Sequence, residues 1–404
     1  MLSQKTIDVV KSTIPALNEH SVALTTLFYT KLFENNPEVK PFFNASNQSD
    51  GRQQKALAGA IVAFAQNVEN LEALAEAVEL ISQKHASLMV KPHHYPIVGA
   101  NLLAAIQELL GLSADHKVVT SWGEAYGFLA GILSNRESEI YAANTNRDGG
   151  WEGFRKFRVA KRVKESSLVT SFYFAPEDGG TLPDYLPGQY LTVRVPMADG
   201  QTTMRNYSLS DKSGSTQFRI SVKHETGNKG AQPAGFVSNY LHTLLEEGGS
   251  IELGPPCGEF VLDSNVNPEK PLVFLAGGIG ITPLLSMVKT ALSKTPGQTA
   301  IFVHACQNKD VQAFRTVLNE LSERHPNLTL RHRYTDASTD ITGEDNASHG
   351  LVDCAFLESL IEDADAEYFI CGPDGFMSAM TGLVSARGVA DAQIRYESFG
   401  PKLG

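Results

Sequence analysis

A histidine on an apolar helix face is the first residue in this sequence whose position suggests chemistry. His85 falls in a series with Leu74, Val78, Ile81 and Leu88, at steps of four and three residues. This spacing places all five side chains on one face of a predicted helix. An imidazole there is either a core histidine bonded to a backbone carbonyl or an axial ligand to haem iron. For a single histidine the core role is the more common one.

Other polar or aromatic side chains in the first 145 residues are candidates for the same site. Glu137 lies on the inward stripe of the last predicted helix, where a carboxylate is costly unless it is bonded. Its alternative role is a helix-end salt bridge with Arg136. His93 and His94 are rival ligands, but they follow Pro92 and leave the apolar face. The other candidates, each of which also has an ordinary role in a helix core, are Tyr29, Gln53, Leu57 and Tyr95.

An Arg-Asn-Tyr-Ser segment that begins at Arg205 resembles the R-x-Y-S motif of the ferredoxin–NADP reductase-like family. Alternation puts Arg205 and Tyr207 on one strand face. There a guanidinium suits a pyrophosphate, a phenol ring can lie against an isoalloxazine, and the Ser208 hydroxyl can bond the flavin N5 edge. Tyr190 in an upstream turn and Ser238 at a predicted helix start add to this FAD signature. A barrel strand with a surface arginine is the alternative.

A glycine-rich turn after a buried apolar run is the third candidate. Gly278 and Gly280 give a G-x-G start whose backbone N–H groups can approach a pyrophosphate. Pro283 replaces the third glycine of the ordinary dinucleotide fingerprint, and this agrees with the G-x-G-x-x-P of the same reductase family. Any tight strand-to-helix turn would also use glycine. The Cys-Gly-Pro segment at Cys371 resembles the family motif beside the nicotinamide, although a small buried cysteine needs no thiol chemistry. The spacing leaves NADH and NADPH both open.

Three stretches with different hydrophobic periods must position these residues. The first 145 residues have a helical period, and the pattern then alternates with period two, as in the antiparallel strands of a small β-barrel. From about Lys270, buried apolar runs alternate with helical segments, which favours a doubly wound α/β unit with a parallel sheet. The strands expected most clearly are residues 157–163, 172–174, 190–194, 218–222, 271–276, 299–304 and 367–371.

These periods predict a multidomain chain. We expect an all-α domain at residues 1–145, a polar linker at 146–152, an antiparallel β-barrel domain at 153–264 and an α/β domain with a C-terminal tail at 265–404.

Composition excludes several classes of protein. The chain of 404 residues carries 34 Lys and Arg against 45 Asp and Glu, a net charge of −11, which argues against a general nucleic-acid or anionic-membrane binder. Its four cysteines form no CxxC pair, so a disulfide scaffold or cysteine-rich metal site is excluded and a reducing cytoplasm is favoured. Glycines and Pro283 interrupt the most apolar run, so we expect no transmembrane segment. We also expect a monomer.

The three-module order, together with Pro41-Phe42-Phe43, the Gln53 and Leu57 pair and Gln83-Lys84-His85, resembles flavohaemoglobin over essentially the whole chain. The resemblance implies a globin that binds haem b, with His85 as the proximal ligand. The other haem-pocket residues it implies are Phe43 on the porphyrin, Tyr29, Gln53 and Leu57 on the distal side, and Tyr95 and Glu137 beside the proximal imidazole. Lys84 would tune the redox potential, with a solvated lysine as the alternative.

The same resemblance implies FAD and NAD(P)H sites. The FAD residues it implies are Tyr190, Arg205, Asn206, Tyr207, Ser208, Ser238, Glu397, Ser398, Phe399, Gly400 and Pro401, where Phe399 covers the flavin and Glu397 adjusts potentials. The closing segment could instead be an ordinary chain end. The NAD(P)H residues it implies are Gly278, Ile279, Gly280, Ile281, Thr282, Pro283, Cys371, Gly372 and Pro373.

The activity that the resemblance implies is that of a cytoplasmic NAD(P)H-dependent nitric oxide dioxygenase. Such an enzyme converts NO and O2 to nitrate at a haem reduced through FAD, and so detoxifies nitric oxide. One alternative is a haem-based oxygen or NO sensor or carrier whose reductase keeps the iron ferrous. A buried Glu137 beside Tyr95 disfavours it, because a carrier needs no electron push on bound oxygen. The other alternative is a flavin reductase of free acceptors.

Overall fold

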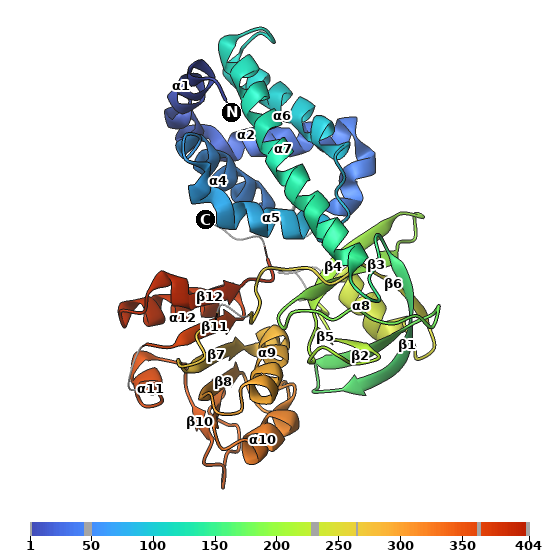
Figure 1. Ribbon diagram of the computed structural model, residues 1–404, viewed down its shortest axis with the longest axis vertical. Helices are drawn as coiled ribbons and strands as arrows, with labels where there is room; N and C mark the ends of the chain where they lie inside the picture. The colour runs from blue at the N-terminus through green and yellow to red at the C-terminus, as the bar shows by residue number, and fades with distance from the viewer. Residues whose placement is uncertain (1, 44–50, 228–233, 264–265, 362–364, 401–404) are drawn as a thin grey trace. The chain divides into compact units, whose positions relative to one another are not determined.

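A computed structural model describes residues 2–43, 51–227, 234–263, 266–361 and 365–400 (Figure 1). The chain divides into two compact units. The first contains the chain up to Asn146 together with residues 196–205 and Gly400, and the second contains residues 147–195 and 206–399. In the described residues no helix is both long and apolar enough to cross a membrane.

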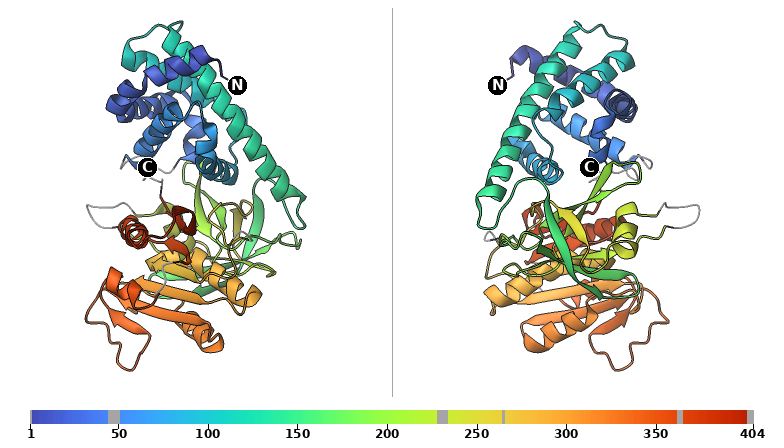
Figure 2. Two further views of the ribbon diagram at one scale, coloured as in Figure 1. Left: turned by 60° about the vertical axis from the view of Figure 1, so that its left-hand side comes forward. Right: turned by 90° about the vertical axis from the view of Figure 1, so that its right-hand side faces the viewer.

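The first unit is helical up to Asn146, as predicted. Its α-helices are α1 (Gln4–Ser12), α2 (Ile14–Asn35), α4 (Arg52–Gln66), α5 (Ala75–Ser87), α6 (His94–Leu110) and α7 (Lys117–Asn146), with short 3-10 helices η1 (Pro37–Phe42) and η2 (Leu71–Leu74). Helix α2 packs on α4 and α6, and α7 packs on α1, α5 and α6. Figure 2 shows α7 as the long helix that runs past the others. Leu24, Phe28, Leu32, Phe64 and Trp122 are central to the core.

The boundary after the helices lies slightly later than the polar residues suggest. The polar segment from Asn144 was expected to close the helical region, but α7 continues through Asn146. Asn144 is buried, because it lies one turn after the buried Ile140 on the inward face of the helix.

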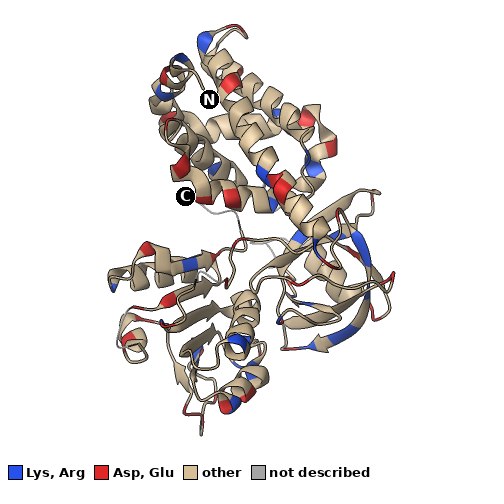
Figure 3. Ribbon diagram, viewed as in Figure 1, with Lys and Arg blue, Asp and Glu red and all other residues tan. Residues whose placement is uncertain are grey.

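The second unit contains most of a six-stranded sheet, whose described strand pairs are antiparallel. Its strands are β1 (Arg155–Lys164), β2 (Val169–Pro176), β3 (Tyr190–Pro196), β4 (Thr202–Ser208), β5 (Phe218–Lys223) and β6 (Ser250–Leu253), in the order β4-β3-β6-β1-β2-β5. Helix α8 (Phe236–Thr243) follows β5. Strand β1 shows why the period is two, because Phe157 and Val159 are buried while Arg158 between them is exposed. The Lys and Arg residues of β1 appear as a long, mostly blue stretch in Figure 3.

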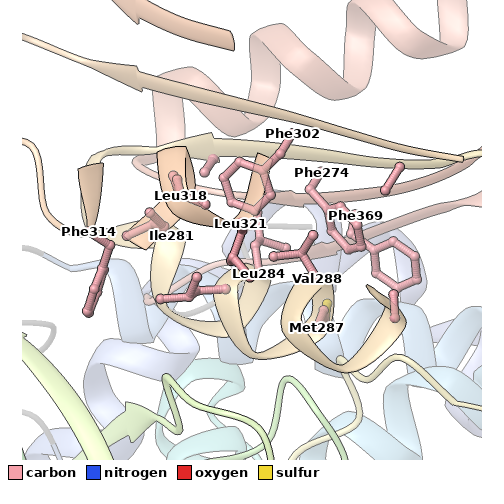
Figure 4. Packing of buried hydrophobic residues seen from close by; sticks show 14 of the residues in the cluster. Phe274, Ile281, Leu284, Met287, Val288, Phe302, Phe314, Leu318, Leu321 and Phe369 are labelled. Atoms are coloured by element: carbon pink, nitrogen blue, oxygen red, sulfur yellow. The ribbon is translucent and has the colours of Figure 1, made fainter. Parts of the chain in front are cut away.

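The unit continues with a parallel sheet in the order β10-β9-β8-β7-β11-β12. Its strands are β7 (Leu272–Gly277), β8 (Ala300–Cys306), β9 (Leu328–Tyr334), β10 (Ala347–His349), β11 (Glu367–Cys371) and β12 (Ile394–Glu397). Helices α9 (Ile281–Lys294) and α10 (Arg315–Arg324) bury Leu284, Val288 and Leu318 against Phe274 and Phe302 of the sheet (Figure 4). Leu357 of α11 (Cys354–Glu358) and Met377 and Met380 of α12 (Asp374–Ala386) belong to a second cluster. This arrangement confirms the doubly wound prediction.

The strand order reverses at β7, which lies between β8 and β11. In doubly wound sheets, ligands bind at the carboxyl ends of the strands on either side of such a reversal. Both glycine-containing segments identified from the sequence follow these ends. Within the η3 turn (Gly278–Gly280), a Cβ added to Gly280 would lie 2.2 Å from the Cys371 carbonyl oxygen. Only glycine therefore allows the two segments to approach this closely.

Gly280→Ala should lower the free energy of unfolding by about 2 kcal/mol or more, since a backbone atom must move to make room for the methyl group. Gly382→Ala is the matched control, because nothing lies within 4 Å of the Cβ at this exposed position in α12. The control should be neutral or stabilise by under about 1 kcal/mol. Urea unfolding followed by circular dichroism measures both, and equal midpoints for the two variants would contradict the packing argument.

Candidate functional site

Three helices bring His85, Tyr95 and Glu137 together. The His85 Nδ1 atom at the end of α5 lies 2.8 Å from the Glu137 Oε1 atom on α7 and 3.1 Å from the Tyr95 hydroxyl on α6. The Tyr95 hydroxyl donates to the same Oε1 atom at 2.5 Å. The three residues are separated by 10 and 42 positions in sequence, so only helix packing joins them.

The hydrogen-bond roles in this group follow from the chemistry of each partner. A carboxylate only accepts, so the His85 Nδ1 atom carries a proton and donates it to Glu137. In a neutral ring the Nε2 atom then keeps its lone pair. No hydrogen bond to the Nε2 atom comes from the described residues, and 33% of the His85 side chain is exposed against 1% of Glu137. A histidine with one nitrogen fixed by a carboxylate and the other unshared is the arrangement that metal-ligating histidines adopt.

Burial holds Tyr95 in its protonated form. The pKa of the Tyr95 phenol is raised well above its usual range, first by burial and then by the hydrogen bond to Glu137 and the charge of that carboxylate. The phenol is therefore a permanent donor at physiological pH. Tyr126 on α7 donates to the Tyr95 backbone oxygen at 2.7 Å, which fixes the start of α6 beside the carboxylate.

The alternative pairing of Glu137 with Arg136 is wrong. Arg136 forms two bonds with Glu79, at 2.6 and 3.0 Å, and a third with Glu139 at 2.7 Å. Consecutive residues on a helix point about 100° apart, so Arg136 leaves the face that carries Glu137. The Glu137 Oε2 atom is buried without a hydrogen-bond partner among the described residues. The carboxylate is thus committed to His85 and Tyr95.

The apolar face around His85 is not fully covered by the described residues. Val78, Ile81 and Leu88 are all of intermediate burial, as are Phe43 and Leu57 on other segments. A soluble helical unit rarely leaves such a face uncovered. This apolar surface beside an unshared imidazole nitrogen fits a planar apolar group that carries a metal, and so it fits haem.

Aromatic contacts place two further predicted residues beside each other. The rings of Tyr29 and Phe43 are 5.6 Å apart in an edge-on arrangement, and Phe33 contacts both rings. Gln53 is the second residue of α4, half-buried, one turn before Leu57. Both therefore lie on one face of α4, as predicted.

The remaining predicted residues of the helical unit point elsewhere or already have partners. Lys84 is exposed. His93 is also exposed. The His94 Nδ1 atom accepts from the Lys91 backbone N–H at 2.9 Å, its ring lies against Phe42, and burial lowers its pKa. Neither rival histidine shares the environment of His85.

The predicted flavin residues lie on β4 and its neighbours. Arg205 donates to the Met204 backbone oxygen at 2.6 Å, and the Asn206 Oδ1 atom accepts from Thr192 on β3 at 3.0 Å. Ser208 is buried and Tyr207 is half-buried. Tyr190 pairs with Cys257 through both backbone groups, and a Cβ at Gly258 would lie 2.9 Å from its ring.

Ser238 has a structural role at the start of α8. Its hydroxyl donates to the Gly235 carbonyl at 2.9 Å and accepts from the Glu225 N–H at 3.3 Å. These bonds fix the first turn of α8. The N–H groups of a first turn have no partners within the helix, so this end of α8 suits an anion such as a phosphate.

The predicted NAD(P)H segments, which begin at Gly278 and Cys371, and the predicted flavin residue Glu397 lie at the carboxyl ends of neighbouring parallel strands. Gly278 has a φ of +52°, and Thr282 and Pro283 are in the first turn of α9. Cys371 pairs with Ala276 on β7 and with Glu397 on β12, so both predicted sites share this edge. Burial, reinforced by the Glu397 charge, raises the pKa of the Cys371 thiol.

Beyond β12, the described chain bends at residues 399–400. The Ser398 hydroxyl lies 3.3 Å from the Asp374 Oδ1 atom, and Phe399 is 52% exposed. Gly400 is the last described residue, and Pro401 lies outside the described residues.

Sequence reasoning missed Asp211, which ties the flavin segment to α9. This aspartate, three residues after Ser208, pairs with Lys289 and Arg219, while Ser286 donates to its backbone oxygen at 2.6 Å. Its pKa is lowered because these two cations outweigh the effect of burial. An acidic residue shortly after the motif was its only sequence signal.

Comparisons with known proteins cover the whole chain. A globin model matches residues 26–133, an oxidoreductase FAD-binding domain matches 156–262 and an oxidoreductase NAD-binding domain matches 274–381. A flavohemoprotein of Rhodopirellula baltica is 45% identical over 403 residues, which cover 100% of this chain and 98% of the relative.

Two solved structures agree with these matches. Flavohemoglobin from Malassezia yamatoensis, solved with bound FAD and heme, is 28% identical with a TM-score of 0.85 and covers 99% of this chain and 100% of its own. The flavohem-like FAD/NAD binding domain of nitric oxide dioxygenase from Vibrio cholerae is 34% identical with a TM-score of 0.55, over 63% of this chain and 100% of that one.

Tyr95→Phe tests the donor role of the phenol. The variant should lose about 1 kcal/mol of unfolding free energy at pH 8, because the buried carboxylate loses a donor. The folded pKa is raised, so above about pH 10 the unfolded chain ionises Tyr95 while the folded chain does not, and the wild-type advantage should shrink. Urea unfolding at several pH values measures this difference. A difference between the two proteins that stays constant up to pH 11 would contradict the burial of a protonated phenol.

Proposed function

The chain belongs to the flavohemoprotein family, and from this membership we propose that it is an NAD(P)H-dependent nitric oxide dioxygenase that detoxifies NO. Its cofactors are haem b and FAD. When bound, FAD accepts hydride from NAD(P)H and passes single electrons to the haem, whose iron supplies the centre at which NO and O2 become nitrate. The observation that carries the proposal is the bond between His85 and the buried Glu137.

His85 would hold the haem iron through its Nε2 atom. Glu137 accepts a hydrogen bond from the His85 Nδ1–H group and gives the imidazole anionic character. This character increases electron donation from the Nε2 atom. Tyr95 donates to the same carboxylate oxygen and so orients it toward the ring. This electron push favours oxygen activation over reversible storage, and it argues for the dioxygenase over a sensor or carrier.

The pocket opposite His85 would be formed by Tyr29, Gln53, Phe43 and Leu57. Tyr29 supplies a buried hydroxyl that would donate a hydrogen bond to dioxygen, and Gln53 adds a second polar group at the start of α4. Phe43 and Leu57 present apolar surface, which admits small uncharged gases and excludes ions. Lys84 is exposed beside His85 and would act on the haem only through its charge.

The reductase residues would bind FAD and NAD(P)H. Arg205 would pair with the pyrophosphate, Tyr207 and Tyr190 would lie against the flavin, Ser208 would bond its N5 edge, and Ser238 would hold α8 for a phosphate. The closing segment from Glu397 through Pro401 would cover the other flavin face with Phe399. The turn from Gly278 to Pro283, with Cys371, Gly372 and Pro373, would bind NAD(P)H.

We propose domain boundaries to match. Haem would be held within residues 1–145, FAD within 153–264 and NAD(P)H within 265–404, with 146–152 as the linker. The end of α7 at Asn146 supports the first boundary. We further propose that the protein acts as a cytoplasmic monomer.

The dioxygenase proposal is tested by rapid mixing of the NADH-reduced, oxygenated holoprotein with nitric oxide. We expect consumption of NO with one nitrate formed per NO. Slow NO decay without stoichiometric nitrate would favour the sensor or carrier. Absence of a Soret band after haem supplementation would favour a flavin reductase of free acceptors.

His85→Ala and Arg205→Ala should separate the two cofactor sites. The first variant loses its only proposed iron ligand, so it should lose haem but keep NADH-dependent reduction of ferricyanide. The second should retain haem and lose FAD affinity by about tenfold to a hundredfold, because a charge-assisted pair contributes roughly 1.5–3 kcal/mol. Absorption spectra of the purified variants measure both contents, and coupled loss of both cofactors would contradict the assignment.

Glu137→Gln should retain haem and lower the rate of NO conversion by about tenfold to a hundredfold, as loss of the partner of a metal-ligating histidine typically does. The iron–histidine stretching band in the resonance Raman spectrum should fall in frequency as electron donation weakens. An unchanged band would show that the carboxylate does not act through the imidazole. Glu139→Gln on the exposed face of α7 is the control.

A further inference from the structure

A buried hydrogen-bond network lies beneath the turn Gly278–Gly280, which we call the nicotinamide turn, and the function proposed above does not use this network. His304 and His332 are opposite each other on the adjacent strands β8 and β9, and both side chains are fully buried. The Gln312 Nε2 atom lies between them, 3.2 Å from the His304 Nδ1 atom and 2.8 Å from the His332 Nδ1 atom. The His304 Nε2 atom is 3.0 Å from the Gly278 carbonyl oxygen.

The proton positions in this network follow from its two ends. A carbonyl oxygen only accepts, so the His304 Nε2 atom must donate to Gly278. The Nδ1 atom of the neutral His304 ring then accepts, and at the other end the Tyr334 hydroxyl donates to the Gln312 Oε1 atom at 2.5 Å. Gln312 therefore turns its NH2 group toward both imidazoles, and each Nδ1 atom accepts. The Gly278 end and the Tyr334 end of the network therefore give the same orientation of the Gln312 amide.

The second histidine completes the arrangement. With its Nδ1 atom accepting, the neutral His332 ring carries its proton on the Nε2 atom, which lies 2.9 Å from the Asn319 Oδ1 atom. Every polar atom of Gln312 is then used. Both rings are held in the neutral form, because a protonated Nδ1 atom would face the NH2 donors of Gln312.

The charges around the network agree with neutral rings. Burial lowers the pKa of His304 to about 4 and that of His332 to about 3, and for His332 the Arg315 and Lys309 cations lower it further while Glu344 opposes them. Burial also raises the pKa of the Cys306 thiol to about 12. The Cys306 Sγ atom lies 3.1 Å from the His304 Nε2 atom and remains a neutral neighbour at physiological pH.

The bond from His304 fixes one peptide plane of the nicotinamide turn. The Gly278 carbonyl accepts from His304 and also from the Ile281 N–H of its own turn, which uses both of its lone pairs. The described residues contain no cis peptide bond, so the Ile279 N–H points opposite to the Gly278 carbonyl, away from the buried ring of His304. Gly278 and Ile279 are only half-buried, so part of this turn is exposed.

We propose that His304, held by Gln312, is a positioning residue for the coenzyme: its Nε2 proton fixes the Gly278 carbonyl and so directs the Ile279 N–H toward the NAD(P)H pyrophosphate. The inference rests on the proposed NAD(P)H site at Gly278–Pro283 and is independent of the reaction at haem. Gln312 acts through His304, and neither side chain touches the coenzyme.

The first test compares His304→Leu with His304→Gln in the full-length holoprotein. With ferricyanide as acceptor, the leucine variant should raise the KM for NADH about tenfold and leave kcat within about twofold, because a bond to a binding peptide is lost. Glutamine places an N–H donor at a similar reach and should restore most of the affinity. Calorimetric titration with NAD+ should show the same order of Kd values.

Two controls separate positioning from loss of structure. 1-Benzyl-1,4-dihydronicotinamide donates hydride but has no pyrophosphate, so its rate should be the same in wild type and His304→Leu. Phe302→Leu changes a buried residue in the same strand outside the network and should leave the KM for NADH unchanged. An equal rise in KM for Phe302→Leu, or an equal loss of rate with the phosphate-free donor, would overturn the proposal.

Gln312→Glu gives a pH readout that a purely structural role would not produce. A carboxylate accepts, so the neutral His304 ring must turn its proton to the Nδ1 atom and present a lone pair to the Gly278 carbonyl. The imidazolium form restores the Nε2 donor. The KM for NADH in this variant should therefore rise between about pH 6 and 8, as the ring loses its proton, while the wild-type KM stays flat.

Nitrogen-15 NMR of the histidine rings tests the premise directly. The His304 signals, identified by their loss in His304→Gln, should show a protonated Nε2 and an unprotonated Nδ1 atom. The opposite tautomer, or a flat pH profile for Gln312→Glu, would overturn the assignment. None of these measurements uses nitric oxide, so they fail or succeed separately from any test of the dioxygenase activity.

Discussion

The buried carboxylate of Glu137 is the group on which the helical unit depends. Its side chain is 1% exposed, and removing a carboxylate from water costs several kcal/mol unless donors replace the lost solvent. Two donors from two other helices do so, the His85 Nδ1–H and the Tyr95 O–H. The register of α5, α6 and α7 must therefore keep three side chains within about 3 Å of one another. The same requirement leaves the other imidazole nitrogen available to a metal.

The second unit satisfies a different constraint, because its proposed NAD(P)H-binding turn consists mainly of backbone groups at strand ends. Gly280 and Cys371 are 91 residues apart in sequence, and parallel pairing of β7 with β11 brings their segments into contact. Backbone N–H and C=O groups are the same in almost every residue. The direction in which they point must therefore be set by the side chains that pack under the turn. In this protein a fully satisfied network of imidazole, amide and phenol groups lies under the turn, where an unpaired polar atom would be costly.

Much of this fold could be predicted from hydrophobic period, and the failures have physical reasons. The strands near residues 157–163, 218–222 and 367–371 were found because each is long enough to show its pattern. β10 has three residues and β12 has four, which is too short for a period to appear. In β9, buried leucines alternate with Thr329 and Arg331, which is unusual for a parallel strand, so an all-apolar criterion misses it.

The sequence by itself determined which residues could carry chemistry: a histidine on an apolar stripe, a carboxylate on another, a glycine turn after a strand and the arginine motif of the barrel. It did so because helical and strand periods are local properties that a few residues display. Only the tertiary structure decided which partner each group has. Arg136 is adjacent to Glu137 in the chain yet binds Glu79, while His85 is 52 residues away and is bonded to it. Hydrogen bonds depend on distances across packed elements to a few tenths of an ångström, and no local pattern encodes those distances.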